Sequence, residues 1–168
     1  MMQAAELADR LAIQKNIGDY ADALDLKRWD LLDEIFTADA QISFGGQSMD
    51  REEAKRWLRQ ELSDPSLRGY LHMVGNLRIT LMGDQADSIA HVFAPLEKIT
   101  NGAVQLGFNG LWYAWRHIRT PKGWRIAGSL DHWAKRKPDW QPGFYGWVTP
   151  PYSTSADWSA PLPADLAF

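Results

Sequence analysis

The sequence predicts an α+β fold in which helices come first and an antiparallel sheet follows. Apolar residues recur at helical spacing in the first third of the chain, and from Tyr70 onward the pattern becomes extended. The extended part is divided by turn signals at Gly83-Asp84, Asn101-Gly102 and Pro121-Lys122-Gly123. Because Asn-Gly suits a type I′ turn, we expect a hairpin there and a meander of four long strands overall.

Three helices and a short strand are expected before the sheet. The first helix covers residues 4–24, and its apolar face is formed by Leu7, Leu11, Ile17, Ala21 and Leu24. The second runs from Leu26 to Phe36, and a short strand over residues 40–44 ends at Gly45-Gly46. The third follows Asp50, an N-cap that forms a capping box with Glu53. Its buried side should consist of Ala54, Trp57, Leu58 and Leu62.

The four long strands are expected at residues 70–82, 85–99, 103–119 and 124–134. Pro95 lacks a backbone N–H, so it predicts a bulge or an edge in the second of them. Gly107 and Gly110 predict sharp bends of a curved sheet in the third.

We expect two parts in the chain, a domain over residues 1–136 and a tail over residues 137–168. The tail contains the stretch WQPGFYGWVTPPY, whose prolines disfavour a helix or a central strand. Disordered tails are usually poor in aromatic residues, whereas this one is rich in them. The tail should therefore be ordered and pack on the domain or on a neighbouring subunit.

Composition excludes several classes of function. The chain has no cysteine, so disulfides, thiolate metal sites and thiol catalysis are ruled out. A net charge of −3 gives no electrostatic reason to bind nucleic acid or a membrane surface. No apolar run approaches the roughly 18 residues of a membrane span, and the N-terminus does not resemble a signal peptide, so the cytoplasm is the expected location. Metal and nucleotide motifs are absent, and we expect no cofactor.

Asp25 is the first candidate for a site residue. It falls at or just past the end of the first helix, where the partial negative charge of the helix terminus disfavours a carboxylate. A cationic partner would compensate, and His72, 47 residues further on, is the leading candidate. A buried pair would hold the imidazole in one tautomer and increase its basicity. The alternatives are that Asp25 pairs with backbone or with Arg28, and that His72 is an ordinary core histidine.

Three stretches carry a resemblance to a known family. They are ADRLAIQKNIGDYADALDLKRWDLLDEIFTADAQI, LHMVGNLRITLMGDQADSIAHVF and GLWYAWRHIRTPKGWRIAG. In this order and spacing, over residues 4–134, the chain resembles the SnoaL-like branch of the nuclear transport factor 2-like superfamily. Within that branch it is most similar to the scytalone dehydratase and lindane dehydrochlorinase groups. The resemblance implies a cone-shaped, curved antiparallel sheet, or half-barrel, that is closed by the N-terminal helices and contains a pocket.

The resemblance also implies roles for individual residues. In both groups a carboxylate on the first helix and a histidine on the first long strand form a general-base pair, and these positions match Asp25 and His72. Tyr20 falls where the dehydrochlorinase group has a lysine, and we take it as a third catalytic candidate. The expected substrate-binding residues are Leu24, Trp29, Phe44, Leu96, Asn109, Leu111, Tyr113 and His132.

Several of these residues replace polar groups of scytalone dehydratase, which implies a more apolar pocket. Leu24, Phe44 and Leu96 stand in place of two tyrosines and a histidine, and Leu111 and Tyr113 lie near the places of a serine and an asparagine. Scytalone itself is therefore not the expected substrate. The arginine that the dehydrochlorinase group has near the last strand finds no match at Leu130, Asp131 or His132, which disfavours dehydrohalogenation.

The implied function is a cofactor-independent, dehydratase-like lyase that acts on a small aromatic or alicyclic substrate. The pair Asp25–His72 would remove a proton, and Tyr20 or a water molecule would polarise a carbonyl or protonate a departing hydroxyl. The alternatives are a non-catalytic ligand-binding or scaffold protein of the same fold, and a ketosteroid-isomerase-like or polyketide-cyclase-like enzyme. Self-association is expected, as a trimer or a dimer.

Overall fold

The computed structural model describes residues 3–44, 47–131 and 144–148. The helical elements are α1 (Ala4–Asp25), the 3-10 turn η1 (Trp29–Leu31), α2 (Leu32–Ile35) and α3 (Arg51–Glu61). The strands are β1 (Phe36–Phe44), β2 (Gln47–Met49), β3 (Leu67–Tyr70), β4 (Met73–Met82), β5 (Gln85–Thr100), β6 (Ala103–Thr120), β7 (Gly123–Asp131) and β8 (Phe144–Val148). None of the described helices is long and apolar enough to cross a membrane.

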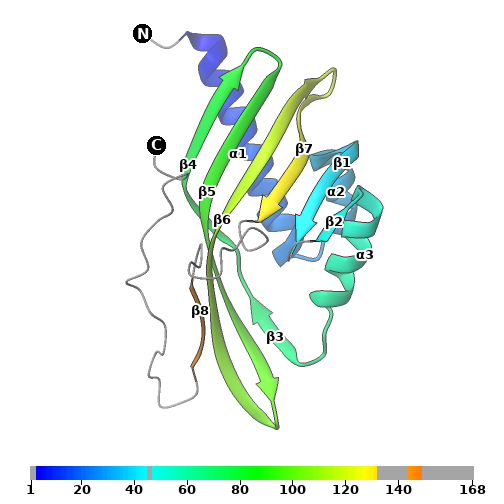
Figure 1. The fold of residues 1–168 in the computed structure, drawn as a ribbon, viewed down its shortest axis with the longest axis vertical. Coiled ribbons are helices and arrows are strands. Elements are labelled where there is room, and N and C mark those ends of the chain that lie inside the picture. The colour runs from blue at the N-terminus through cyan, green and yellow to red at the C-terminus, as the bar shows by residue number, and fades with distance from the viewer. Residues whose placement is uncertain (1–2, 45–46, 132–143, 149–168) are drawn as a thin grey trace.

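The eight described strands form one curved sheet that α1 crosses on one face (Figure 1). The order is β2-β1-β7-β6-β5-β3, with β4 also paired to β5 and β8 to β6. The α+β class and the meander from β4 to β7 are confirmed. The sheet is mixed rather than wholly antiparallel, because β1 pairs with β7 in parallel. Helix α1 packs against β4 and β7, and α3 packs against β1, so the helices close the concave side.

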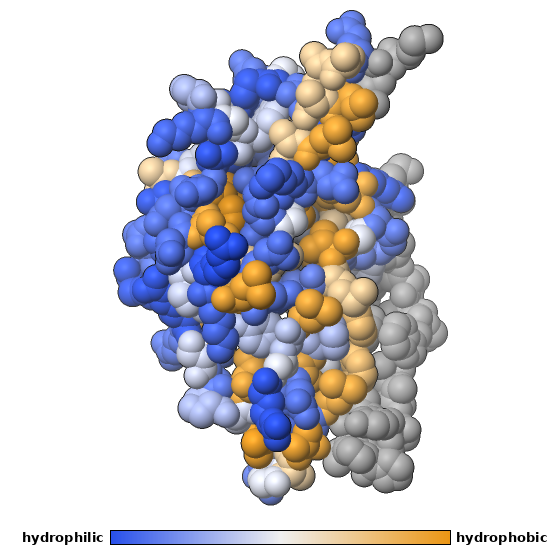
Figure 2. All heavy atoms as spheres, turned by 180° about the vertical axis from the view of Figure 1, so that it is seen from behind, coloured by the Kyte–Doolittle hydropathy of each residue, from blue (hydrophilic) through white to orange (hydrophobic). Residues whose placement is uncertain are grey.

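Helix α1 buries a stripe of mostly apolar residues against the sheet, formed by Ile13, Asn16, Ile17, Tyr20, Ala21, Ala23 and Leu24. The expected buried face was wrong at its N-terminal end, where Leu7 is 45% and Leu11 is 56% exposed. The first turns of α1 lie at the end of the sheet, beside the β4–β5 turn, where little of the sheet remains to cover them (Figure 1). Apolar side chains consequently reach the surface at this end of the helix (Figure 2).

Local signals fixed several elements as expected. Asp50 caps α3 by accepting a hydrogen bond from the Glu53 backbone N–H at 2.8 Å, and the Glu53 carboxylate accepts one from the Asp50 N–H at 3.1 Å. Asn101 and Gly102 have φ values of 52° and 76°, the left-handed pair that a type I′ turn requires. The capping box and the hairpin are therefore both confirmed.

The expected second helix is replaced by a turn, η1 and one short turn of α2. The cause is a Schellman-type end of α1, in which the Lys27 N–H donates to the Leu24 carbonyl and the Arg28 N–H donates to the Ala23 carbonyl. Lys27 takes the left-handed conformation at φ 53°, although it is not a glycine. The chain thus turns sharply after Asp25, which leaves too few residues for a full second helix before β1.

The expected strand over residues 70–82 is divided into β3 and β4, with Leu71 and His72 between them. On the neighbouring strand, the Pro95 carbonyl accepts a hydrogen bond from the Leu71 N–H at 3.2 Å. In a β-strand the N–H and C=O of one residue point to the same side. An N–H at position 95 would therefore also point towards Leu71 and His72, but proline has none to donate. β5 itself runs without a register shift against β6 and lies inside the sheet, between β6 and the pair β3 and β4, so the predicted bulge or edge at Pro95 is wrong. The break is in the partner strand instead.

Part of the predicted tail is described. Residues 144–148 form β8, which pairs with residues 106–110 of β6, beside the stretch of β6 that pairs with β7. The remainder of the tail lies outside the described residues, and so does His132 at the end of the predicted domain.

Candidate active site

Asp25 and His72 form a close pair at the point where α1 ends and the strand is broken. Nδ1 of His72 lies 2.6 Å from Oδ1 of Asp25, and the backbone N–H of His72 donates to Oδ2 at 2.9 Å. Both side chains are largely buried, with 13% of His72 and 12% of Asp25 exposed. Because each carboxylate oxygen accepts from a different group of the same residue, the position and the rotation of the imidazole are both fixed.

The fold creates this contact through two local irregularities. The left-handed turn at Lys27 ends α1 directly after Asp25, which leaves its carboxylate at the helix terminus. The gap between β3 and β4 removes the His72 N–H from the β ladder, so it can donate to a side chain instead. An ionised carboxylate has no donor of its own, so the Nδ1–H donates to Asp25, and in the neutral imidazole the lone pair then lies on Nε2.

Tyr70 contacts both the end of α1 and the His72 ring. Its hydroxyl donates to the Leu24 carbonyl at 3.0 Å, and its ring meets the His72 ring edge-to-face at 6.0 Å between centroids. Desolvation, followed by the negative charge of Asp25, raises the pKa of Tyr70 above its ordinary value of 10.0. The phenol therefore stays neutral and remains a donor, which ties the end of α1 to the end of β3.

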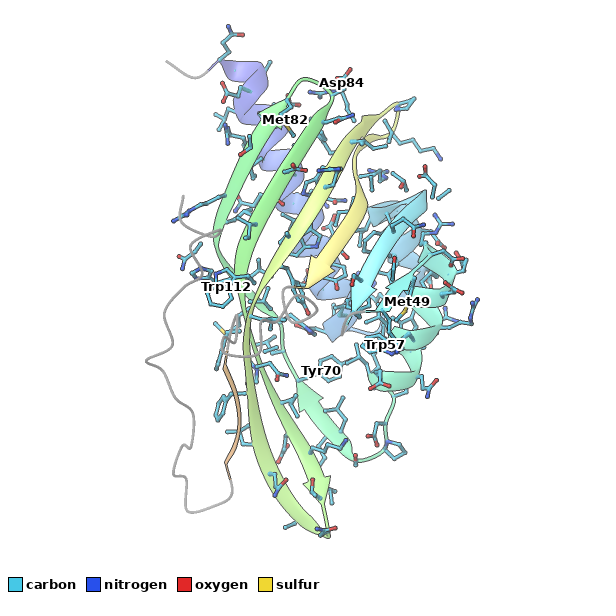
Figure 3. The ribbon with its side chains drawn as sticks, in the orientation of Figure 1. Met49, Trp57, Tyr70, Met82, Asp84 and Trp112 are labelled. Atoms are coloured by element: carbon cyan, nitrogen blue, oxygen red, sulfur yellow. The ribbon has the colours of Figure 1, made fainter. Side chains whose placement is uncertain are left out.

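His72 faces a pocket of about 240 Å³ between α1, α3 and the sheet. Its walls are formed by Tyr20, Leu24, Phe44, Trp57, Leu58, Glu61, Leu62, Ala94, Asn109, Leu111 and Tyr113. Figure 3 shows that Trp57 comes from α3 and Tyr70 from the end of β3. Within the described part of the chain, Nε2 of His72 has no hydrogen-bond partner, so it is available to a ligand.

The structure brings together most of the residues that the sequence singled out. Tyr20, Leu24, Phe44, Asn109, Leu111 and Tyr113 all line the pocket with His72, and Asp25 lies behind the imidazole. Asn109, Leu111 and Tyr113 share one face of β6 because successive strand residues alternate.

Two of the expected wall residues do not line the pocket. Trp29 packs against the hydrophobic core instead, since it belongs to the short 3-10 turn rather than to a second helix. Leu96 pairs with Tyr70, two residues further along β5 than Ala94, and Ala94 takes the wall position. His132 lies outside the described residues.

Sequence reasoning missed the role of α3 and of Ala94 in the pocket. Trp57, Leu58 and Leu62 were expected to be buried, but not to form a wall of the site. Glu61 is not among the predicted site residues. Yet Ala54, Trp57, Leu58 and Glu61 follow the spacing i, i+3, i+4, i+7 of one helix face. A carboxylate on an otherwise apolar stripe was the signal that could have found it.

Two further histidines lie outside this site. His117 is fully buried on β6, its Nε2 lies 2.7 Å from the Ser88 hydroxyl, and burial lowers its pKa to about 4. His91 is on the surface, where Nδ1 lies 2.9 Å from Nδ2 of Asn76. Desolvation, followed by the charge of Arg78, lowers the pKa of His91. Across the described residues, no group of three or more His, Asp or Glu side chains is arranged to hold a metal ion.

Comparison with known proteins agrees with the fold. The family model for the SnoaL-like domain matches residues 5–129, which is most of the chain. The chain belongs to the SnoaL-like family. It is 40% identical over 134 residues to an uncharacterized protein of Mycobacterium tuberculosis, a match that covers 78% of this chain and 89% of that protein.

Solved structures of the same shape share less of the sequence. A putative scytalone dehydratase from Novosphingobium aromaticivorans superposes with a TM-score of 0.67 at 20% identity, over 76% of this chain and 85% of the other. A type 2 hexachlorocyclohexane dehydrochlorinase superposes with a TM-score of 0.65 at 21% identity, over 75% of this chain and 86% of the other. A protein from Kribbella flavida superposes with a TM-score of 0.66 at 23% identity, over 77% of this chain and 98% of the other. At these identities the likeness establishes the nuclear transport factor 2-like fold.

Proposed function

We propose that this protein is a cofactor-independent, dehydratase-like lyase that acts on a small aromatic or alicyclic compound by general-base catalysis. The observation that supports it most is the 2.6 Å contact between Asp25 and His72, made beside a pocket that the imidazole lines. The fold shared with a putative dehydratase and a dehydrochlorinase supports the same class of reaction.

In the proposed reaction His72 acts as the base. Nε2 takes a proton from a ring carbon next to the carbon that bears a hydroxyl group, and the C–H electron pair forms the new C=C bond. Asp25 stabilises the imidazolium that results, since its carboxylate already accepts from Nδ1. The C–O bond breaks, and the hydroxyl departs with a proton as water.

Tyr20 is proposed as the acid for the departing hydroxyl. It lies on α1 one turn before Leu24, lines the pocket, and is only 2% exposed. The proton that Tyr20 gives up balances the one that His72 gains, and exchange with water after product release restores both groups. Asn109, on β6 in the same pocket, is proposed to donate a hydrogen bond that orients the ring.

The size of the pocket favours a single ring. An apolar cavity of about 150 Å³ accommodates benzene, and drug-sized ligands need roughly 300 Å³ or more. A pocket of about 240 Å³ falls between these limits. It therefore suits a substituted monocyclic compound better than the fused rings of a steroid or an aromatic polyketide.

The proposal can be tested on the purified protein with a panel of cyclic β-hydroxy ketones. The conjugated enone product absorbs short-wavelength ultraviolet light far more strongly than the hydroxy ketone, so loss of water can be followed directly. We expect turnover by the wild type and a loss of about 10²- to 10⁴-fold in His72→Ala. His91→Ala, which removes a surface histidine, is the matched control and should retain full activity. Equal turnover by His72→Ala and the wild type would reject the proposed base.

Self-association as a trimer or dimer is also proposed. Leu71 and Met73 flank His72 along the chain and are 48% and 55% exposed, so burying them in an interface would be favourable. Light scattering after size-exclusion chromatography distinguishes the two assemblies, and a monomer at micromolar concentration would contradict both.

A further inference from the structure

Two helices end at the candidate active site, and each ends in a carboxylate. Asp25 is the last residue of α1, and Glu61 is the last residue of α3. Leu24 and Glu61 both line the pocket. A helix C-terminus carries roughly half a negative charge, so two dipole ends and two acidic side chains act on one small cavity.

The charge of Glu61 is not compensated locally. It is exposed, and within the described part of the chain its carboxylate forms no ion pair or hydrogen bond. The two other glutamates of α3 differ in this respect. Glu52 pairs with Arg51 and Lys55, and Glu53 belongs to the capping box at the favourable end of the helix.

The pocket wall itself offers no permanent positive charge. None of the described residues that line it is a lysine or an arginine. Lys27 lies 6.0 Å from the centre of the Tyr70 ring, but neither residue is part of the wall. A carboxylate or phosphate ligand would therefore enter a negative potential without a counter-ion.

We propose that Glu61 is a specificity-determining residue, through which this pocket selects small ring compounds that carry a protonated amine and rejects anionic ones. The inference rests on the proposed function, because it assigns a substrate class to the same pocket. The ammonium group would lie at the rim beside Glu61, with the ring between the walls and the reacting carbon near His72. The stacked pair Phe44–Trp57, whose ring centres are 5.0 Å apart, adds aromatic surface that also favours a cation.

The expected size of the effect follows from the exposure of Glu61. At a solvated rim the attraction between two unit charges is weak, on the order of a threefold to tenfold change in affinity. The preference should also decrease with salt, since charges separated by more than about 10 Å are screened at 0.1 M ionic strength.

The test uses three probes of equal shape and different charge, namely benzylamine, benzyl alcohol and benzoate. Their affinities are measured by NMR titration, with the imidazole signals of His72 and the side-chain amide of Asn109 showing that binding occurs in the pocket. The variant is Glu61→Gln. The matched control is Glu52→Gln, which removes the same charge about 13 Å away along α3, given a rise of 1.5 Å per residue.

We expect the wild type and Glu52→Gln to bind benzylamine most tightly and benzoate most weakly, and Glu61→Gln to lose about threefold to tenfold of the amine preference. Binding of all three probes with equal affinity, or an unchanged preference in Glu61→Gln, would overturn the charge selection while leaving the proposed base intact. Failure of all three probes to bind would reject the pocket as a ring-binding site, and the charge selection with it. If the three probes bind in the expected order of affinity but no hydroxy ketone is turned over, the charge selection stands and only the proposed function is rejected.

Discussion

The substitution Asp25→Asn should change the tautomer of His72 as well as the charge of the pair. In the native site both oxygens of Asp25 accept, one from Nδ1–H of the imidazole and one from the backbone N–H of His72. Asparagine has nearly the same shape, but it has one acceptor oxygen, and an NH₂ group that donates takes the place of the second oxygen. The backbone N–H cannot change its role, so the asparagine oxygen should turn towards it and the NH₂ group towards Nδ1. Nδ1 must then accept, and the proton moves to Nε2.

This exchange places an N–H where the base needs a lone pair. A wrong tautomer in a comparable carboxylate–histidine arrangement costs about 10⁴-fold in turnover, so we expect a loss of about 10³- to 10⁴-fold here. The fold should survive, because the two hydrogen bonds are kept in altered form and a carboxylate is removed from an unfavourable helix terminus. The net change in the free energy of unfolding should not exceed about 1–2 kcal/mol.

The assay is a two-bond ¹H–¹⁵N correlation spectrum of the imidazoles at neutral pH, which distinguishes a protonated from an unprotonated ring nitrogen. We expect Nδ1–H in the wild type and Nε2–H in Asp25→Asn. Asp22→Asn, an exposed position one turn earlier on α1, serves as the control and should leave the spectrum of His72 unchanged. If the Asp25→Asn variant kept the Nδ1–H form, or turned over substrate at the wild-type rate, the assigned role of Asp25 would be wrong.

Three further predictions concern stability. Tyr70→Phe removes the bond to the Leu24 carbonyl and should lower the free energy of unfolding by about 1 kcal/mol in urea denaturation; an unchanged midpoint would show that the bond contributes nothing. Asp50→Ala removes the cap of α3 and should cost about 1 kcal/mol, whereas Asp30→Ala, outside any cap, should cost far less. The pKa of His117 is lowered to about 4 in the folded protein, so the unfolded chain binds this proton first as the pH falls below about 6.5. Stability should therefore decrease by about 2–3 kcal/mol between pH 7 and pH 4.5, and His117→Gln should flatten that dependence; an equal slope in both proteins would contradict the assignment.

The parts of the fold that depend on neighbouring residues could be predicted from the sequence. The capping box at Asp50 and the hairpin at Asn101-Gly102 each need only a few adjacent residues, and both are confirmed. The end of α1 could be placed only approximately. Its left-handed turn is made by Lys27, a residue type that gives no such signal.

The parts of the fold that depend on contacts between distant residues could not be predicted from the sequence. The break in the strand begins at Leu71, which lies opposite Pro95, 24 residues further on, and only pairing between strands brings the two together. The parallel contact of β1 with β7 depends on where the chain returns after three long strands. The contact of Asp25 with His72 was expected for electrostatic reasons and from family resemblance, but its second hydrogen bond, from the His72 backbone, depends on that same break.

The central claim is that the Asp25–His72 pair removes a proton from a ring compound held in the pocket. The most direct measurement is the rate at which a simple ring ketone, such as cyclohexanone, exchanges hydrogen for deuterium next to its carbonyl in D₂O, followed by ¹H NMR. We predict acceleration by the wild-type protein and by His91→Ala, and none above the buffer rate by His72→Ala or Asp25→Asn. Exchange that is equally fast with His72→Ala and with the wild type would contradict the claim.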